Sequence, residues 1–303
     1  MKLRDRVTEL LLALLLGAGT LLTPICALAS SPKTGNPEAL PPTASREAEA
    51  AVSPDIPFHE YEDQIERQLL DLANQSRAAA GAPPLILDAG LSQAARIHAK
   101  AMLEARQLSH RFEGEASLPQ RLATTTHLQL DAEGENVAFD YSAEGGHQNL
   151  MLSPPHRANL LDPAFNVVGL GVVRSGDRLY MVQDFGHAVP NYSAAEVKDR
   201  IAAAVNQMRQ HGGRPELQRL DLPAVDGAAC SMAHADKLGT APVYELAARY
   251  TVMTFTTLHS ETLPASAAHA ITSPNLHSVS IGDCYGRTAS YPTGVYWVVL
   301  SLD

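Results

Sequence analysis

Three short segments combine ionisable side chains with tight local geometry, and each could contribute to a chemical site. LSH ends at His110, GEN is centred on Glu135, and SPPH ends at His156. Imidazole nitrogens and a carboxylate oxygen are a sufficient ligand set for an open zinc site with a water in the fourth position. The same groups can act as a general base and a general acid. We therefore take His110, Glu135 and His156 as candidate catalytic residues. His110 and His156 are also candidate metal ligands, with Glu135 as an additional one.

Each of these residues also has an explanation that involves no chemistry. A single histidine after a helix end commonly caps carbonyl groups or lies at the surface, and a glutamate in Gly-Glu-Asn is often a turn residue. His98 lies on the apolar face of a predicted helix, which indicates a hydrogen-bonded core histidine. Three other histidines have no partner at a recognisable spacing and are expected at the surface or behind the site: His127, His147 and His187.

A glycosidase with paired carboxylates, Glu133 and Glu135, is a weaker hypothesis. We take this segment as an extended turn and expect residues two apart to point to opposite sides. The sequence has no GxSxG, HExxH, CxxC or Walker-type glycine loop. The commoner hydrolase and nucleotide-binding motifs are therefore excluded.

Helices are expected before the site and a hairpin after it. Apolar residues recur at helical spacing from residue 65 to residue 73, and Gly81 with Pro83-Pro84 ends that helix. A second helix is predicted over 91–105, and GEN is placed in a short turn before Val137. The segments 167–173 (VVGLGVV) and 179–185 (LYMVQDF) predict a β-hairpin. This order indicates an α+β domain in which helices cover an antiparallel sheet.

The chain also contains an internal repeat. Segment 74–102 can be laid on 206–236, so that Arg77 matches Arg209 and, with a two-residue insertion, Ala94-Ala95 matches Ala228-Ala229. Further on, Ser153-Pro154 matches Ser273-Pro274. The second half is therefore predicted to be a diverged copy of the first.

Length, charge and the N-terminal segment limit the possible function. The 303 residues suffice for about two domains, and the net charge of −10 without a Lys/Arg-rich run excludes an ordinary nucleic-acid-binding protein. Residues 1–29 carry basic residues, an apolar run and a final ALA, which predicts a cleaved signal peptide. An uncleaved membrane anchor and a lipid-modified Cys26 are alternatives. We expect a secreted or periplasmic mature chain that does not span the membrane.

The mature chain keeps two cysteines, Cys230 and Cys284. An even pair in an oxidising compartment predicts one disulfide, which would stabilise its domain by roughly 3–5 kcal/mol. Two unpaired buried thiols are the alternative. Residues 30–58 are rich in Pro, Ser, Ala and Glu without apolar periodicity and are predicted to be a linker.

The ordered motifs NQxR, LSH, GEN, SPxHRANLL, VGLGV and VQDFG, from about Glu60 to Gly186, resemble the bacterial branch of the CAP superfamily. This superfamily of SCP-like proteins includes the cysteine-rich secretory proteins, antigen 5 and the plant pathogenesis-related proteins. The resemblance implies an α-β-α sandwich with a central three-stranded antiparallel sheet. It also implies a cleft that holds His110, Glu135 and His156, with Asn136 supporting the turn.

Two departures from the family pattern stand out. Ser153 stands where animal and plant members carry a second cleft glutamate, and Pro155 replaces the glycine usual in the bacterial SPGH turn. In the second half GEN is missing, and Leu276 is placed at the position of His156. We therefore expect a CAP domain at 59–190 and a degenerate CAP-like domain, held by the disulfide, at 191–303.

Two functions follow from the resemblance. The first is an extracytoplasmic binding module for a lipid, glycan or protein of the envelope or the exterior, with Zn²⁺ as the candidate cofactor at His110 and His156. The second is a metal-dependent hydrolase of peptide, ester or cell-wall substrates, in which Glu135 takes the proton of a zinc-bound water. Fold membership alone does not establish a reaction.

Overall fold

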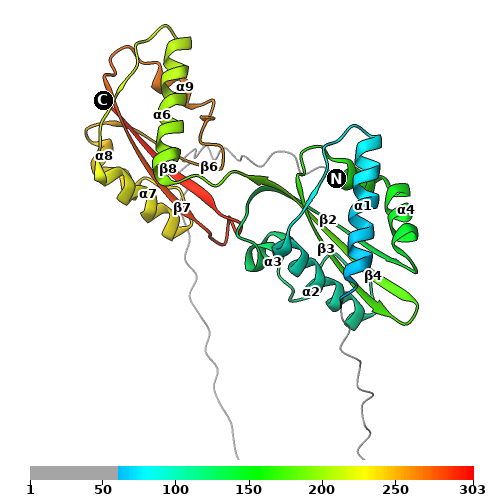
Figure 1. Ribbon diagram of the computed structural model, residues 1–303. Coiled ribbons are helices and arrows are strands. Elements are labelled where there is room, and N and C mark those ends of the chain that lie inside the picture. Colours follow the sequence, from blue (N-terminus) through cyan, green and yellow to red (C-terminus); the bar gives the residue numbers. More distant parts are fainter. Residues whose placement is uncertain (1–60) are drawn as a thin grey trace, which may run out of the picture. The chain divides into compact units, whose positions relative to one another are not determined.

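The computed structural model describes residues 61–303, so the predicted signal peptide (1–29) and linker (30–58) lie outside the described residues. The first half contains five helices and four strands in the described range (Figure 1). In chain order they are α1 (Asp63–Ala79), β1 (Ile86–Leu87), α2 (Ala89–Ala105), α3 (Leu118–Thr125), β2 (Gln129–Asp140), α4 (Ala143–Leu152), α5 (Pro154–Leu161), β3 (Val167–Ser175) and β4 (Arg178–Val189). This mixture of helices and strands confirms the α+β class.

The first sheet has the strand order β1-β3-β4-β2. Strands β3 and β4 form the predicted hairpin, with Ser175 opposite Arg178 and Gly176 at a φ of +59° in the turn. Strand β2 pairs antiparallel with β4, and the two-residue strand β1 pairs parallel with β3. The sheet is thus four-stranded, not three-stranded, because the chain between α1 and α2 adds a short parallel edge.

The sequence predicted that the GEN motif lies in a turn, and this is wrong. The motif lies inside the long strand β2. Gly134, Glu135 and Asn136 pair in unbroken register with Phe185, Asp184 and Gln183 of β4. The only irregularity in this pairing lies earlier, between Leu130 and Ala132. Because side chains alternate along a strand, Glu135 and Asn136 point to opposite faces of the sheet.

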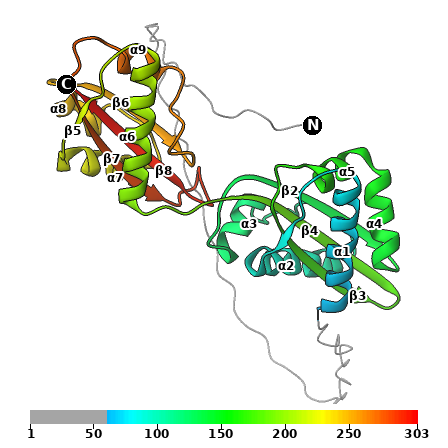
Figure 2. The same cartoon turned by 45° about the horizontal axis from the view of Figure 1, so that its top comes forward.

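Helices cover both faces of this sheet, as the second view also shows (Figure 2). On one face Val172 packs with residues of α1, α4 and α5, and on the other Val173 packs with residues of α2. Helix α2 lies against the sheet backbone because β3 has glycine at 169 and 171. A Cβ at Gly171 would collide with the backbone of Ala95 in α2.

Helix α1 is fixed by Arg77, whose side chain is fully buried. Its guanidinium donates hydrogen bonds to four backbone carbonyls, at 2.6 to 2.9 Å: those of Pro83, Leu160, Asp162 and Phe165. These carbonyls belong to the loop after α1 and to the segment that follows the SPPH turn. Arg77 therefore connects the helix that begins the domain to the end of α5, which carries His156.

The second half has a sheet of order β5-β7-β8-β6, again with a two-residue parallel edge strand. Its elements are α6 (Ala194–His211), β5 (Gln218–Arg219), α7 (Pro223–Ala235), the 3₁₀ helix η1 (Ala241–Val243), α8 (Tyr244–Ala247), β6 (Thr251–Thr257), α9 (Ala267–Ile271), β7 (Ser278–Gly286) and β8 (Val295–Leu302). The predicted disulfide is confirmed: Cys230 of α7 is bonded to Cys284 of β7, with Cα atoms 5.0 Å apart. It joins a helix to the sheet that the helix covers.

Arg209 repeats the hydrogen bonding of Arg77. It is fully buried and donates to four backbone carbonyls: those of Pro215, Ile271, Ser273 and Leu276. Leu276 therefore takes the place of Phe165, and counting back along the chain places Ala267 at the position of His156. The sequence matches of Leu276 with His156 and of Ser273-Pro274 with Ser153-Pro154 are wrong.

Two strand glycines that lie against helix backbones also show which residues of the two halves correspond, and they correct the predicted alignment. A Cβ at Gly282 of β7 would collide with the backbone of Val225 in α7, as one at Gly171 would with Ala95. Val225, not Ala229, is thus the counterpart of Ala95. The separation from Arg209 to Val225 is two residues shorter than that from Arg77 to Ala95, whereas the predicted alignment made it two residues longer. In residues 61–303, none of the helices is long and apolar enough to cross a membrane.

Candidate functional site

The structure brings the three predicted site residues together. His110 follows α2, whose last turn is closed by Arg106 in the left-handed conformation, and His156 lies in the first turn of α5. The centroids of the two imidazole rings are 6.2 Å apart. His110 Nδ1 lies 2.8 Å from Glu135 Oε1. A loop, a strand and a helix therefore each supply one residue.

Glu135 is held from two sides. Its side chain is only 5% exposed, and while Oε1 bonds to His110, Oε2 forms an ion pair with Arg121 of α3. Arg121 is itself buried and also donates a hydrogen bond to the carbonyl of His110, at 3.1 Å. Sequence reasoning missed Arg121, because the segment between His110 and β2 has no motif. The sequence feature that could have indicated Arg121 is the helix start at Ser117, where a capping box with Gln120 begins α3.

His98 is a core histidine, as predicted. It is fully buried, with Nδ1 2.6 Å from Glu115 Oε1 and Nε2 2.8 Å from the carbonyl of Ser109. These bonds tie the loop that carries His110 to helix α2. His98 Nε2 is also 3.9 Å from Glu135 Oε2, so this histidine lies directly behind the site.

His156 is oriented by its own helix start. Ser153 is the N-cap of α5, and its hydroxyl lies 2.9 Å from His156 Nδ1. Asn136 donates a hydrogen bond to the carbonyl of His156, at 3.1 Å, and Asn159 donates to the carbonyl of Glu135. Asn136 therefore fixes α5 against β2 and does not support a turn. Ser153 therefore orients the histidine.

The two histidines of the site differ in their tendency to carry a proton. The hydrogen bond to Glu135 raises the pKa of His110, against the opposing effect of its partial burial. Burial lowers the pKa of His156, and the neighbouring His110 lowers it further. Near neutral pH, His110 is therefore the better proton donor and His156 the better lone-pair donor.

Asp184 is a second buried carboxyl that the sequence analysis did not select. It lies opposite Glu135 in the β2–β4 pairing, is completely buried, and neither oxygen has a hydrogen-bond partner among the described residues. Burial, and then the charge of Glu135, raise the pKa of Asp184 well above its usual range. Burial therefore favours the neutral form of Asp184, beside the ion pair between Glu135 and Arg121.

Glu133 shares a face of β2 with Glu135, because residues two apart in a strand point the same way. The expectation that the two would point to opposite sides is wrong, since the segment is a strand and not a turn. Burial, and then the charge of Asp131, raise the pKa of Glu133 to about 7. A carboxylate pair would still need a free Glu135, and both of its oxygens are engaged.

The other histidines lie apart from this site. His147, expected at the surface or behind the site, is buried away from the site, with Nε2 2.8 Å from the hydroxyl of Ser76, and it packs α4 against α1. His187 is bonded to Asp131, with Nδ1 2.5 Å from Oδ1. For His127 the structure shows no side-chain hydrogen bond among residues 61–303. Within that same range, no three His, Cys, Asp or Glu side chains form a group that could hold a metal ion.

Part of the ligand set expected for zinc is nevertheless present at the site. In His110 and His156 the Nδ1 atoms are engaged by Glu135 and Ser153, and each Nε2 lacks a hydrogen-bond partner in the described part of the chain. A zinc-ligating histidine typically uses one nitrogen for the metal while a carboxylate or another polar group holds the other. Two histidines thus fit as ligands. Glu135 fits as the carboxylate behind His110 and not as a third ligand, because Arg121 occupies its other oxygen.

Comparisons with known proteins place part of the chain in a family. Residues 70–185 match the model of the family described as CAP, the cysteine-rich secretory protein family. Uncharacterized membrane protein YlbC of Bacillus subtilis (strain 168) is 32% identical over 121 residues, which are 40% of this chain and 34% of that protein. Uncharacterized protein YkwD of the same organism is 30% identical over 112 residues, or 37% and 43% of the two chains. The matched region thus spans less than half the length of these relatives.

Among solved structures, an extracellular protein containing an SCP domain from Bacillus anthracis str. Ames is 28% identical, with a TM-score of 0.38. The match covers 41% of this chain and 41% of that one. The residues matched by the family model, 70–185, fall on the first of the two sheets.

Proposed function

Because residues 70–185 are a domain of the CAP, or cysteine-rich secretory protein, family, we propose that this domain is an extracytoplasmic binding module. Its ligand-binding cleft is the site formed by His110, Glu135 and His156. The observation that carries the proposal is the pair of histidines 6.2 Å apart, each held through Nδ1 and each presenting Nε2. The ligand is a lipid, glycan or protein of the envelope or the exterior.

A divalent metal, Zn²⁺ in particular, is the candidate cofactor of this cleft. His110 and His156 would hold it through Nε2, and the remaining positions would be left for water or for a ligand group. A bound zinc would supply a Lewis acid. Since His110 has a raised pKa, a metal must displace a proton from this residue, and zinc binding should strengthen as the pH rises from 6 to 8.

The test is zinc binding by calorimetry on the protein and on the His110→Ala/His156→Ala variant. The matched control is His211→Ala/His269→Ala, which removes two exposed histidines of the second half. Micromolar binding that is lost only in the cleft variant would support the metal site. Equal binding by the cleft variant, or none by the protein, would refute it. The search for a lipid, glycan or protein ligand would then proceed without metal.

A metal-dependent hydrolase remains the alternative, with Glu135 as the general base. This role requires a carboxylate oxygen that can reach a water. In the structure one oxygen of Glu135 accepts from His110 and the other pairs with Arg121, which favours an orienting role over a basic one. Zinc-dependent release of product from ester or cell-wall substrates, lost in Glu135→Gln, would support the hydrolase instead.

For the second half we propose a diverged CAP-like domain at 191–303, beside the CAP domain at 59–190, with the same α-β-α sandwich. The shared strand order and the paired arginines Arg77 and Arg209 support this view. Matching strand register and helix ends places three other residues at the positions of His110, Glu135 and His156: Thr240, Val252 and Ala267. None of these is ionisable, so the second half lacks the cleft chemistry.

The compartment follows from the same family membership. We propose that the chain is secreted or periplasmic, with 1–29 as signal peptide and 30–58 as linker. The disulfide Cys230–Cys284 supports an oxidising environment. N-terminal sequencing of the exported protein would test the cleavage after Ala29.

A further inference from the structure

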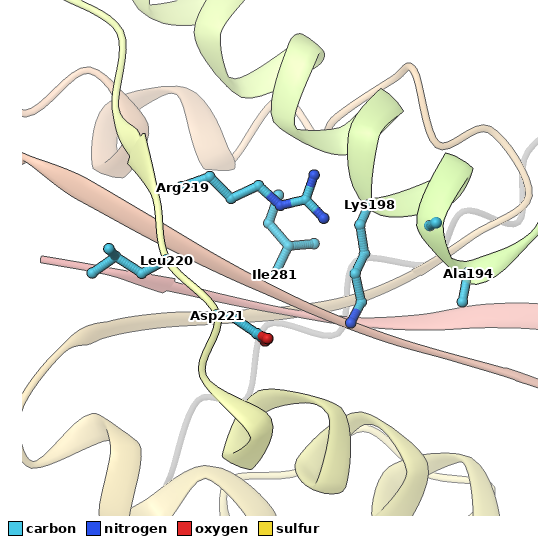
Figure 3. A pocket seen from close by; sticks show the side chains of 7 residues that line it. Ala194, Lys198, Arg219, Leu220, Asp221 and Ile281 are labelled. Atoms are coloured by element: carbon cyan, nitrogen blue, oxygen red, sulfur yellow. The ribbon is translucent and has the colours of Figure 1, made fainter.

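The second half contains a hollow of about 500 Å³ beside the start of helix α6. Its walls and floor come from α6, from β5 with the residues after it, and from β7, and they consist of Ala194, Ala195, Lys198, Arg219, Leu220, Asp221 and Ile281. Figure 3 shows Arg219 extending from β5 and Lys198 extending from α6 on the other side, with Asp221 below Arg219 in this view. The volume lies within the range of small-molecule sites.

The charged residues beside the hollow differ from those at the equivalent place in the first half. In the first half Arg96 of α2 forms ion pairs of 2.5 Å with both Asp63 and Glu66 of α1. Helix positions and glycine contacts place Ala195, Lys198 and Asp226 at the corresponding sites of the second half. The ion pair is reversed, with Lys198 Nζ 2.7 Å from Asp226 Oδ1. Ala195 and Lys198, which line the hollow, stand where the first half has Asp63 and Glu66, the two partners of Arg96.

One edge of the hollow is suited to a carboxylate. Arg219 is partly exposed and uses Nη1 for Asp199, so the rest of its guanidinium faces the opening. The first two backbone N–H groups of α6, at Ala194 and Ala195, have no acceptor within their helix, and the helix start carries partial positive charge. Lys198 adds an ammonium group to the same edge.

The rest of the surroundings does not suit a simple anion. Two cations, Lys198 and Arg219, are outnumbered by four carboxylates: Asp199, Asp221, Asp226 and Asp283. The side chain of Asp283 is 3% exposed and lies 3.9 Å from Lys198 Nζ, and its Oδ1 has no hydrogen-bond partner among the described residues. It shares with Ile281 the face of β7 that meets α6. Asp283 does not line the hollow itself, so the carboxylate available to a cationic or amine group there is that of Asp221.

We propose that this hollow binds a small zwitterion, an amino acid or short peptide. Its carboxylate lies against Arg219, Lys198 and the start of α6, and its ammonium group faces Asp221. The alanines and Ile281 form an apolar wall for a small side chain. The site is independent of the histidine cleft, since no residue is shared.

The test is an NMR titration of the ¹⁵N-labelled protein with L-alanine, L-alanyl-L-alanine, acetate and methylammonium. We expect the alanine compounds to shift the amide signals around Ala194 and Lys198 with affinities about tenfold tighter than either single-charge probe. Arg219→Gln and Asp221→Asn should each weaken alanine binding at least about tenfold. Arg67→Gln is the control, because it removes an exposed arginine of α1 in the first half.

Three results would overturn the proposal. Acetate that binds as tightly as alanine would indicate a plain anion site, and methylammonium that does so would indicate an amine site. If none of the four probes shifts these signals, the hollow is not a zwitterion site. Because Arg219 and Asp221 are not core residues, both variants are expected to fold, and either one alone decides the role of its own charge.

Discussion

Replacing the buried Arg77 by methionine should destabilise the CAP domain severely. Methionine keeps much of the length of arginine but cannot donate, so four carbonyls lose their partner: Pro83, Leu160, Asp162 and Phe165. Hydrogen bonds from a charged donor contribute about 1.5–3 kcal/mol each, or about 6–12 kcal/mol together. Burying the guanidinium, which lowers the pKa of Arg77, offsets several kcal/mol of this. We expect a net loss of about 4 kcal/mol in the free energy of unfolding.

The assay is urea unfolding followed by circular dichroism, with Arg67→Met as the control on the same helix. Arg67 is exposed, so its variant should stay within about 0.5 kcal/mol of the parent. Arg209→Met should cost somewhat less than Arg77→Met, because Arg209 bonds the matching four carbonyls but its bond to Leu276, at 3.4 Å, is longer than the 2.8 Å bond of Arg77 to Phe165. A loss below about 1 kcal/mol in Arg77→Met would refute the reasoning, since it would mean that water satisfies the four carbonyls equally well.

Three further predictions concern the cleft and the disulfide. Glu135→Gln should lower the pKa of His110 towards about 6.5, measured by NMR, because the charge that favours the imidazolium is removed; an unchanged pKa would contradict the assignment. Asp184 has a raised pKa in the folded protein, so its burial costs stability as the pH rises above its unfolded pKa of about 3.9. In thermal melts, the melting temperature of Asp184→Asn relative to that of the parent should therefore be higher at pH 8 than at pH 4. An equal difference in melting temperature at both pH values would argue for an ionised Asp184. Reducing Cys230–Cys284, which closes a 54-residue separation, should destabilise residues 191–303 by about 4 kcal/mol; simultaneous loss of both halves would show a shared core.

The site could be predicted from sequence to the extent that its motifs are local. LSH, GEN and SPPH are short segments whose order resembles the family, and His110, Glu135 and His156 meet in the structure. The resemblance named the positions but not the secondary structure around them, so GEN was placed in a turn. Gly and Asn in the motif favour a turn locally, and the pairing of β2 with β4 overrides that preference.

Other parts could not be predicted, because they depend on pairing across the sheet. Arg121 and Asp184 become site residues only through their positions beside Glu135, and neither stands in a distinctive motif. The repeat was recognised through its NQxR motif, but its alignment failed in α7. Alanine pairs are common on buried helix faces, and only the contacts of Gly171 and Gly282 fix which residues correspond.

The reversed ion pair between the halves has a consequence for folding. Tandem domains of one fold can exchange equivalent helices while they fold. If α6 docked in the place of α1, Lys198 would meet Arg96, and if α1 docked in the place of α6, Glu66 would meet Asp226. Both exchanges would bury like charges next to each other, whereas each correct pairing joins opposite ones. The exchange of charge therefore favours the docking of each helix on its own sheet.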